Sequence, residues 1–178
     1  MKKMNEYLIA GFGGQGILFA GKLLGNIGLI DNKEVTWFPS YGPAMRGGTC
    51  NCSVCISDSL IGSPVVDSPD VLIAMNGPSY DKFINAVKKG GKAFIDNSLV
   101  DSKYDGSDID CFYIPATRLA AENDLKGMAN IIVLGKVIKE TGLATLETVK
   151  AALEVSVPAG KANLIELNMK AIEIGMAN

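Results

Sequence analysis

The residues best suited to chemistry in this sequence form two short glycine-bearing segments. The first, Gly11-Phe12-Gly13-Gly14-Gln15-Gly16, follows an apolar strand candidate and opens a helix candidate. In that context a G-x-G-x-x-G run places backbone N–H groups at the start of a helix, where they attract phosphate and other anions. The first segment therefore predicts a ligand-binding loop, with a plain strand-to-helix turn as the alternative. Its candidate site residues are Gly11, Gly13, Gly14, Gln15 and Gly16.

Each residue of this loop has an expected task. Gly11 would allow the tight turn, Gly13 would let a ligand approach the backbone, and Gly16 would let the helix pack against the strand. The amide of Gln15 would bond either a ligand or a neighbouring loop.

The usual NAD role is disfavoured by the second strand candidate. That role requires an acidic residue at the end of the second strand, roughly 20 residues after the loop, to hold a ribose hydroxyl. The strand at 34–38 ends in Pro39-Ser40-Tyr41, and its one acid, Glu34, stands at its start.

The second segment is Ser40-Tyr41-Gly42-Pro43-Ala44-Met45-Arg46-Gly47-Gly48. The planar guanidinium of Arg46 suits a phosphate or a carboxylate, and Gly47 beside it lets other groups approach the backbone closely. The alternative for Arg46 is to brace its own loop against the first segment. Ser40 and Tyr41 would either donate hydrogen bonds to the same ligand or cap the loop.

The composition argues against several classes of partner. The chain of 178 residues has a net charge of −2, so binding of nucleic acid or an anionic membrane has no electrostatic support. No apolar run reaches the roughly 18 residues of a transmembrane helix, and the first apolar stretch stops at the glycine loop, too early for a signal peptide. The absence of histidine removes the commonest general base and metal ligand.

We expect a cytoplasmic protein without nucleic-acid or membrane partners.

Four cysteines raise the question of a metal site. Cys50, Cys52 and Cys55 invite an iron–sulfur or zinc interpretation, but their spacing differs from that of a ferredoxin-type site, and Cys111 is distant in sequence. The three lie in a strand candidate, where Cys50 and Cys52 share one face and Cys55 points to the other. Buried free thiols in a reducing compartment are therefore favoured over a metal site.

The elements that position both segments alternate between strands and helices. Apolar runs predict strands over 6–10, 34–38, 49–56, 71–75, 92–96 and 110–114. Helical patterns predict helices over 16–30, through Phe83 and Val87 to Gly90, and over 116–123, 128–141, 146–155 and 161–175. This order predicts an α/β fold, a single Rossmann-like domain over residues 1–178. Its sheet would be mixed and mostly parallel, flanked by helices, with a helical C-terminal third.

Three local expectations follow from residue size and type. Ala20 and Gly21 are small enough to bring the first helix close to the sheet. Asp96 and Asn97, which end a strand on the ligand side, are expected to form a turn. The last helix carries an apolar stripe formed by Leu164, Leu167, Ala171 and Ile174.

With both segments in this order, the chain resembles the gamma subunit of the 2-oxoacid:ferredoxin oxidoreductases. These enzymes act on pyruvate, 2-oxoglutarate, branched-chain 2-oxoacids and indolepyruvate. The resemblance covers nearly the whole chain. It rests on the loops at 11–16 and 40–48 and on the segments Ile56-Ser57-Asp58, Ile61-Gly62-Ser63-Pro64, Ile114-Pro115-Ala116-Thr117, Met128-Ala129-Asn130-Ile131 and Leu164-Ile165-Glu166-Leu167-Asn168.

The resemblance implies a holoenzyme that cleaves a 2-oxoacid on thiamine diphosphate and magnesium. It passes electrons through iron–sulfur clusters to ferredoxin and releases acyl-CoA and CO₂. These cofactors would belong to partner alpha, beta and ferredoxin-like delta subunits. This chain would be a non-catalytic companion near the coenzyme A site, with Arg46 facing the diphosphate of coenzyme A or an acid on a partner. A free-standing nucleotide-binding protein that uses the Gly11–Gly16 loop and a purely structural subunit are the alternatives.

Overall fold

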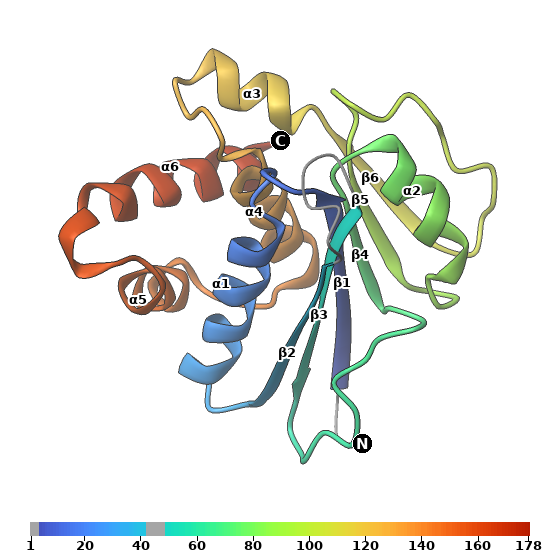
Figure 1. Ribbon diagram of the computed structural model, residues 1–178, viewed down its shortest axis with the longest axis horizontal. Coiled ribbons are helices and arrows are strands. Elements are labelled where there is room, and N and C mark those ends of the chain that lie inside the picture. The colour runs from blue at the N-terminus through green and yellow to red at the C-terminus, as the bar shows by residue number, and fades with distance from the viewer. Residues whose placement is uncertain (1–3, 42–48) are drawn as a thin grey trace.

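A six-stranded sheet organises the chain (Figure 1). The computed structural model describes residues 4–41 and 49–178. The strands are β1 (Met4–Phe12), β2 (Glu34–Tyr41), β3 (Thr49–Ser57), β4 (Val71–Ala74), β5 (Lys92–Asp96) and β6 (Asp110–Ile114), in the spatial order β2-β3-β1-β4-β5-β6. β3 is antiparallel to both of its neighbours, whereas β1, β4, β5 and β6 run parallel to one another. The prediction of a mixed, mostly parallel sheet is confirmed.

In the described residues, six α-helices flank the sheet. They are α1 (Ile17–Ile30), α2 (Gly77–Phe83), α3 (Ala116–Glu122), α4 (Ala129–Thr141), α5 (Leu146–Ser156) and α6 (Asn163–Ala177), with short 3₁₀ turns at Ile84–Ala86 and Ala159–Lys161. The helical C-terminal third is confirmed. The predicted helix through Phe83 and Val87 to Gly90 was wrong in its second half, because α2 ends at Phe83 and only a short 3₁₀ turn follows. β1 and β2 extend beyond their predicted ends, to Phe12 and Tyr41. Among the described residues, no helix has the length and apolar character that a membrane span requires.

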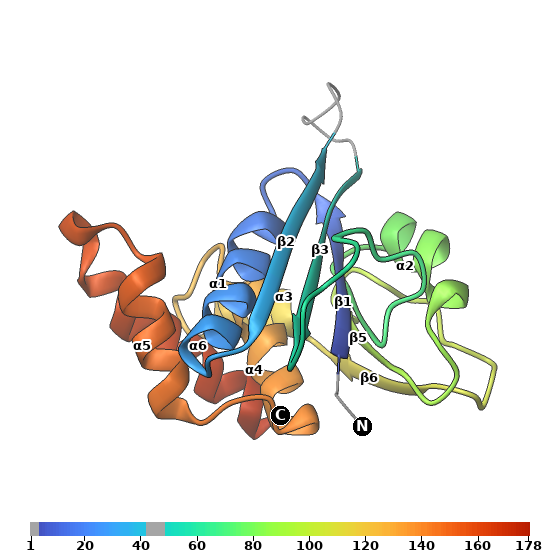
Figure 2. The same ribbon diagram turned by 90° about the horizontal axis from the view of Figure 1, so that it is seen from below.

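The two faces of the sheet bury separate apolar cores, because side chains alternate along each strand. Tyr7 and Ile9 of β1 pack in the larger core with α1, α4, α5 and α6, whereas Leu8 packs in the smaller core with α2. Figure 2 shows these two groups of helices on opposite sides of the sheet. All four residues of β4 are buried, two in each core, as expected for a parallel strand covered on both faces.

α1 lies close to the sheet because its contact face is made of small residues. A Cβ atom on Gly21 would lie 2.3 Å from the Sγ of Cys52 and 3.0 Å from the Nε1 of Trp37, so a side chain does not fit there. Ala20 beside it is buried as well. The expected close packing through Ala20 and Gly21 is confirmed.

α4 and α6 cross so closely that their backbones meet at two glycines. A Cβ atom on Gly135 would lie 2.2 Å from the carbonyl oxygen of Ile172, and one on Gly175 would lie 1.9 Å from that of Ile132. Within the predicted apolar stripe, Ala171 is buried and Leu164 and Ile174 pack partly buried against the larger core, whereas Leu167 is 37% exposed. The closest contact with α4 is made by Gly175, which an apolar pattern does not identify. The buried residues of α6 are Asn168, Ala171, Ile172 and Gly175.

Replacing Gly175 with alanine is expected to lower the free energy of unfolding by about 3 kcal/mol, because the added methyl group forces the two helices apart. Urea unfolding followed by circular dichroism measures the change.

Gly25→Ala is the matched control for this variant. Gly25 also lies inside a helix, but its added Cβ would lie 3.4 Å from the Cγ1 of Val35, an ordinary contact. Alanine is favoured over glycine in a helix by about 1 kcal/mol, so this variant should be at least as stable as the parent chain. Equal losses in both variants would mean that the crossing of α4 and α6 tolerates a side chain.

Candidate functional site

The loop between β1 and α1 takes its shape from two glycines in the left-handed region. Gly14 has a φ of 97°, and Gly16, which caps α1, has a φ of 71°. Residues with side chains rarely adopt these angles, so Gly14 and Gly16 make the turn that was expected at Gly11. Gly11 lies within β1 and provides close packing instead. A Cβ atom there would lie 2.6 Å from the Cδ1 of Ile17 and 2.8 Å from the Oε1 of Gln15.

This loop stands where the chain leaves two neighbouring strands in opposite directions. α1, which follows β1, packs in the larger core, and α2, which follows β4, packs in the smaller one. In doubly wound sheets, ligands bind at this kind of divergence, outside the carboxyl ends of the strands. The first glycine segment therefore occupies the position at which a Rossmann-like domain binds a nucleotide.

The side chain of Gln15 ties the two diverging loops together. Its Oε1 accepts hydrogen bonds from the backbone N–H of Phe12 (2.6 Å) and from the Nδ2 of Asn76 (2.9 Å). Its Nε2 donates to the carbonyl of Met75 (2.9 Å). Asn76 in turn accepts from the N–H of Ser79 and caps α2. The Gln15 amide was expected to bond either a ligand or a neighbouring loop. The structure shows the bond to a neighbouring loop.

A second link connects the glycine loop to α4. The Nδ2 of Asn130 donates to the carbonyl of Gly16 (2.9 Å), while its Oδ1 is buried without a hydrogen-bond partner among the described residues. Reasoning from the sequence assigned Asn130 no role at the site, although it belongs to one of the segments that carried the family resemblance. The available signal was an asparagine in the first turn of a helix, directly before an apolar run, where side chains often bond neighbouring backbone.

The carboxylate of Asp96, at the end of β5, organises the start of α3. It accepts hydrogen bonds from the hydroxyl of Thr117 (2.5 Å), from the N–H of Thr117 and from the N–H of Ser98 (3.0 Å). Asp96 is fully buried, so these donors replace the water that its charge would otherwise require. The expected turn-forming role is confirmed, and Asp96 also supports a helix whose own N-cap residue, Pro115, makes no side-chain hydrogen bond.

β2 and β3 bring Tyr41 and Thr49, the described residues on either side of 42–48, to the same edge of the sheet. Phe12, the last residue of β1, pairs with Thr49 of β3, and Tyr41, the last residue of β2, pairs with Cys50. Figure 2 shows the ends of β1 and β2 on the same side of the molecule. The strands that flank the second segment therefore meet the first segment at the carboxyl edge.

The predicted site residues fall into two groups. The structure brings the loop Gly11–Gly16, with Gly13 half-buried and Gly14 exposed, to the same edge as Ser40 and Tyr41. Arg46 and Gly47 lie outside the described residues. Ligand binding by either group stays a prediction.

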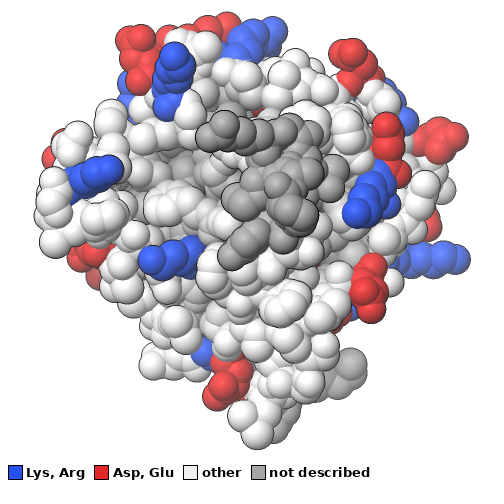
Figure 3. All heavy atoms as spheres, in the orientation of Figure 1, with Lys and Arg blue, Asp and Glu red and all other residues white. Residues whose placement is uncertain are grey.

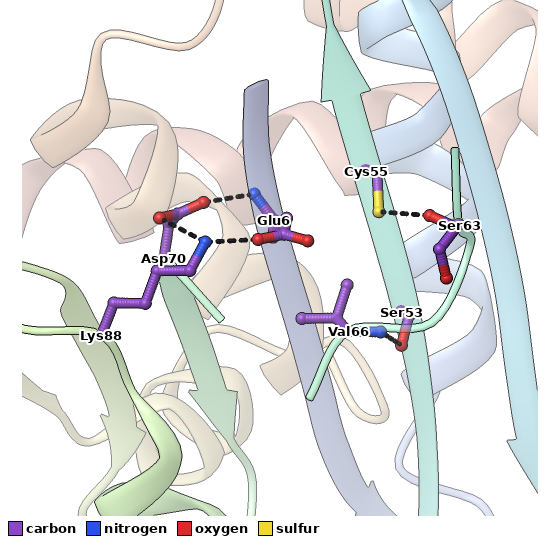
Figure 4. A network of polar contacts seen from close by, with 7 residues as sticks. All are labelled: Glu6, Ser53, Cys55, Ser63, Val66, Asp70 and Lys88. Carbon is purple, nitrogen blue, oxygen red and sulfur yellow. Dashed lines mark hydrogen bonds and ion pairs between the residues drawn. The ribbon is translucent and has the colours of Figure 1, made fainter. Parts of the chain in front are cut away.

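The cysteines of β3 point to both faces of the sheet. The thiol of Cys52 donates to the carbonyl of Ile17 on the α1 side (3.6 Å), whereas that of Cys55 donates to the carbonyl of Ser63 on the other side (3.9 Å; Figure 4). Burial raises the pKa of Cys52 to about 12 and also raises the pKa of Cys50, Cys55 and Cys111. Within the described part of the chain, no three potential ligands form a metal-binding group. The expected division of Cys50 and Cys52 from Cys55 between the two faces is confirmed, and the absence of a metal stays a prediction.

Charges of both signs are mixed among the described residues on the face that Figure 3 shows. Their basic and acidic side chains lie singly or in mixed pairs, without a broad patch of one sign. A nucleic-acid site would need a continuous basic surface.

Together, the diverging loops, the glycine turn and the strand order define a class of protein. The chain is a Rossmann-like α/β domain in which the loop after the first strand is bonded internally through Gln15. Within that class, the chain belongs to the pyruvate ferredoxin/flavodoxin oxidoreductase family, whose sequence profile matches residues 6–178.

Two relatives and one solved structure illustrate this membership. The chain is 40% identical over 163 residues to the 2-oxoglutarate synthase subunit KorC of Methanocaldococcus jannaschii, covering 90% of this chain and 87% of KorC. It is also 38% identical over 169 residues to the ketoisovalerate oxidoreductase subunit VorA of Methanothermobacter thermautotrophicus. That alignment covers 94% of this chain but only 35% of VorA, so the chain spans about a third of the length of this relative. The crystal structure of a keto/oxoacid ferredoxin oxidoreductase gamma subunit from Geobacter sulfurreducens is similar with a TM-score of 0.81 and 29% identity, over 97% of this chain and 96% of that one.

In the folded chain, Cys111 is expected to react first with iodoacetamide at pH 8, because it is half-buried while the other three cysteines are buried. With a pKa of about 12, only about one Cys52 thiol in 10⁴ is ionised at pH 8, so its labelling should await unfolding. Peptide mapping by mass spectrometry gives the order of labelling, and the urea-unfolded chain provides the reference in which all four react. Labelling of Cys52 as fast as Cys111 would contradict the buried position of β3.

Gln15→Met is expected to lower the free energy of unfolding by about 2–3 kcal/mol, because it keeps the side-chain length but leaves three polar partners unsatisfied. Chemical unfolding measures the change. The control is Asn85→Ala at an exposed position, which should change stability by less than about 0.5 kcal/mol. A loss no larger than that of the control would show that the two loops hold together without the Gln15 amide.

Proposed function

We propose that this chain is the gamma subunit of a multisubunit 2-oxoacid:ferredoxin oxidoreductase. Such an enzyme oxidatively decarboxylates a 2-oxoacid to acyl-CoA and CO₂, or runs the reverse reaction. The observation that carries the proposal is the end-to-end correspondence with the solved Geobacter sulfurreducens gamma subunit. The family match over residues 6–178 and the identity with KorC support it further.

In this proposal the chain is a companion rather than the catalyst. It has no histidine to act as a general base, and the buried carboxylate of Asp96 is fully occupied with positioning α3. An iron–sulfur cluster does not fit the described cysteines, because Cys52 and Cys55 face opposite sides of the sheet. Thiamine diphosphate, magnesium and the clusters would therefore belong to alpha, beta and ferredoxin-like delta subunits, with ferredoxin as the electron acceptor. We place this complex in the cytoplasm.

The carboxyl edge of the sheet is the part of the chain that we assign to the coenzyme A site. The exposed Gly14 and the N-terminal end of α1 offer backbone N–H groups to an anion. Ser40 and Tyr41 reach the same edge, and Arg46 follows in the sequence. The diphosphate of coenzyme A is the group that suits an arginine and a helix N-terminus together.

The free-standing nucleotide-binding alternative is less well supported. Gln15 bonds the two loops between which a nucleotide would lie, and the end of β2 offers no acidic residue for a ribose hydroxyl.

Purification of the tagged chain from its native cytoplasm under anaerobic conditions tests the proposal. We expect larger partner subunits to copurify, together with reduction of viologen that depends on a 2-oxoacid and coenzyme A. Recovery of the chain alone, without this activity, would contradict the subunit assignment.

Arg46→Ala in the assembled complex tests the assignment of the carboxyl edge. Loss of a charged hydrogen bond should raise the KM for coenzyme A by about tenfold or more and leave the KM for the 2-oxoacid unchanged. Lys22→Ala, at an exposed position on α1, is the control and should change neither constant. An intact complex with an unaltered KM for coenzyme A would favour the purely structural subunit.

A further inference from the structure

The N-terminal ends of α1 and α4 differ from those of the other described helices. The first turn of a helix leaves backbone N–H groups without partners in the helix, and an acceptor or a negative charge normally satisfies them. Such a group is Asn76 for α2, Asp96 for α3, Thr145 for α5 and Glu166 for α6. Within the described residues, α1 and α4 have neither a side-chain cap nor an acidic residue in the first turn.

These two N-terminal ends meet through one side chain. Asn130, in the first turn of α4, donates from its Nδ2 to the carbonyl of Gly16, the N-cap residue of α1 (2.9 Å). A Cβ atom on Gly16 would lie 2.5 Å from the Nδ2 of Asn130 and 3.4 Å from its Oδ1, so the amide lies directly against the N-cap. Each helix N-terminus carries a partial positive charge of about half an elementary charge, so the pair together favours an anion.

The amide of Asn130 has one unused polar atom. The residue is 3% exposed, and its Oδ1 has no hydrogen-bond partner among the described residues. Because the carbonyl of Gly16 can only accept, the NH₂ group of Asn130 must face it, and the oxygen is the atom that is left over. Buried polar atoms are normally hydrogen-bonded, so this oxygen points to a donor that the described part of the chain does not supply.

Together, the two helix ends and the Asn130 oxygen define a ligand with two properties. It carries a negative charge for the backbone N–H groups, and it has a hydrogen to donate to the Oδ1 of Asn130. A phosphate group that keeps one proton has both properties. Sulfate and carboxylate groups are negative at neutral pH but have no hydrogen to donate, so they would leave the Asn130 oxygen unpaired.

We propose that the N-terminal ends of α1 and α4 bind a singly protonated phosphate group. Its O–H donates to the Oδ1 of Asn130, and its other oxygens accept hydrogen bonds from backbone N–H groups in the first turns of the two helices. This inference deepens the proposed function and rests on it only for the source of the phosphate.

Coenzyme A carries a phosphate monoester on its ribose, in addition to its diphosphate. The second pKa of a phosphate monoester is about 6, so it takes up a proton readily near neutral pH. The diphosphate bridge has no such proton, so it does not match the acceptor of Asn130. The monoester is therefore the group of coenzyme A that fits the position beside Asn130.

NMR titration of the ¹⁵N-labelled full chain with inorganic phosphate tests the proposal. Sulfate at the same pH and ionic strength is the matched control, because it has a similar shape and charge but no O–H. We expect phosphate to cause saturable shifts of the backbone amides of Leu18 and Ala129, in the first turns of α1 and α4. Phosphate should bind at least about tenfold more tightly than sulfate, since a buried acceptor disfavours a ligand that lacks the donor.

Two variants assign the binding to this position. Asn130→Asp keeps the size of the side chain but adds a negative charge, and it should weaken phosphate binding at least about tenfold. Asn163→Asp is the control, because it makes the same change at an exposed position in the first turn of α6 and should leave the affinity unchanged. If circular dichroism shows that Asn130→Asp does not fold, Ala129→Asp decides the outcome. An acid in the first turn of a helix is favourable for the helix and competes with phosphate for its N–H groups.

Dephospho-coenzyme A, which lacks only the ribose phosphate, distinguishes the sources of the group. Binding of coenzyme A about tenfold more tightly than dephospho-coenzyme A would identify coenzyme A as the source. Selection of phosphate over sulfate without a difference between the two coenzymes would identify a free phosphate. Failure of both coenzymes to bind would count against the coenzyme A assignment alone and leave the selection of phosphate intact.

Three results would each overturn the proposal. They are the absence of saturable shifts at the first turns of α1 and α4, equal affinity for sulfate and phosphate, and unchanged phosphate affinity in the folded Asn130→Asp or Ala129→Asp variant.

Discussion

The amide of Gln15 is the interaction on which the carboxyl edge of this domain depends. The chain leaves β1 and β4 toward opposite faces of the sheet, and backbone groups at that divergence lose their partners in the strands. Gln15 satisfies Phe12, Asn76 and Met75 at once, and it fits because Gly11 has no side chain. An edge that is open in nucleotide-binding domains is here bonded within the chain. It can therefore serve as a rigid platform for groups that approach from outside.

The elements of the fold could be predicted because they depend on neighbouring residues. The apolar run at β4 and the small contact face of α1 each carry a local pattern, and both lie where the sequence indicated. The contacts between elements could not be predicted in the same way, because they join residues that are distant in the sequence. Gln15 bonds residues 60 positions away, and nothing in the sequence near it identifies Asn76 or Met75 as its partners.

The packing of α6 and the hydrogen bonds of the candidate site were also beyond prediction from local sequence patterns. The apolar stripe included Leu167, but the residue of α6 that lies closest to α4 is Gly175. A glycine has no side chain, so it does not contribute to a hydrophobic pattern. Asn130 was missed for a related reason. It is notable because its Oδ1 lacks a partner among the described residues, and that becomes visible only when the surrounding residues are in place.

The burial of the β3 cysteines has a consequence for the response of this chain to oxygen. Oxidation of cysteine to sulfenic acid and beyond begins at the thiolate and requires access to it. Cys50, Cys52 and Cys55 are covered by the surrounding structure and hold their protons at neutral pH. Exposure to air should therefore leave these residues chemically intact. Among the cysteines of this chain, oxidation in air would then begin at Cys111, which is half-buried.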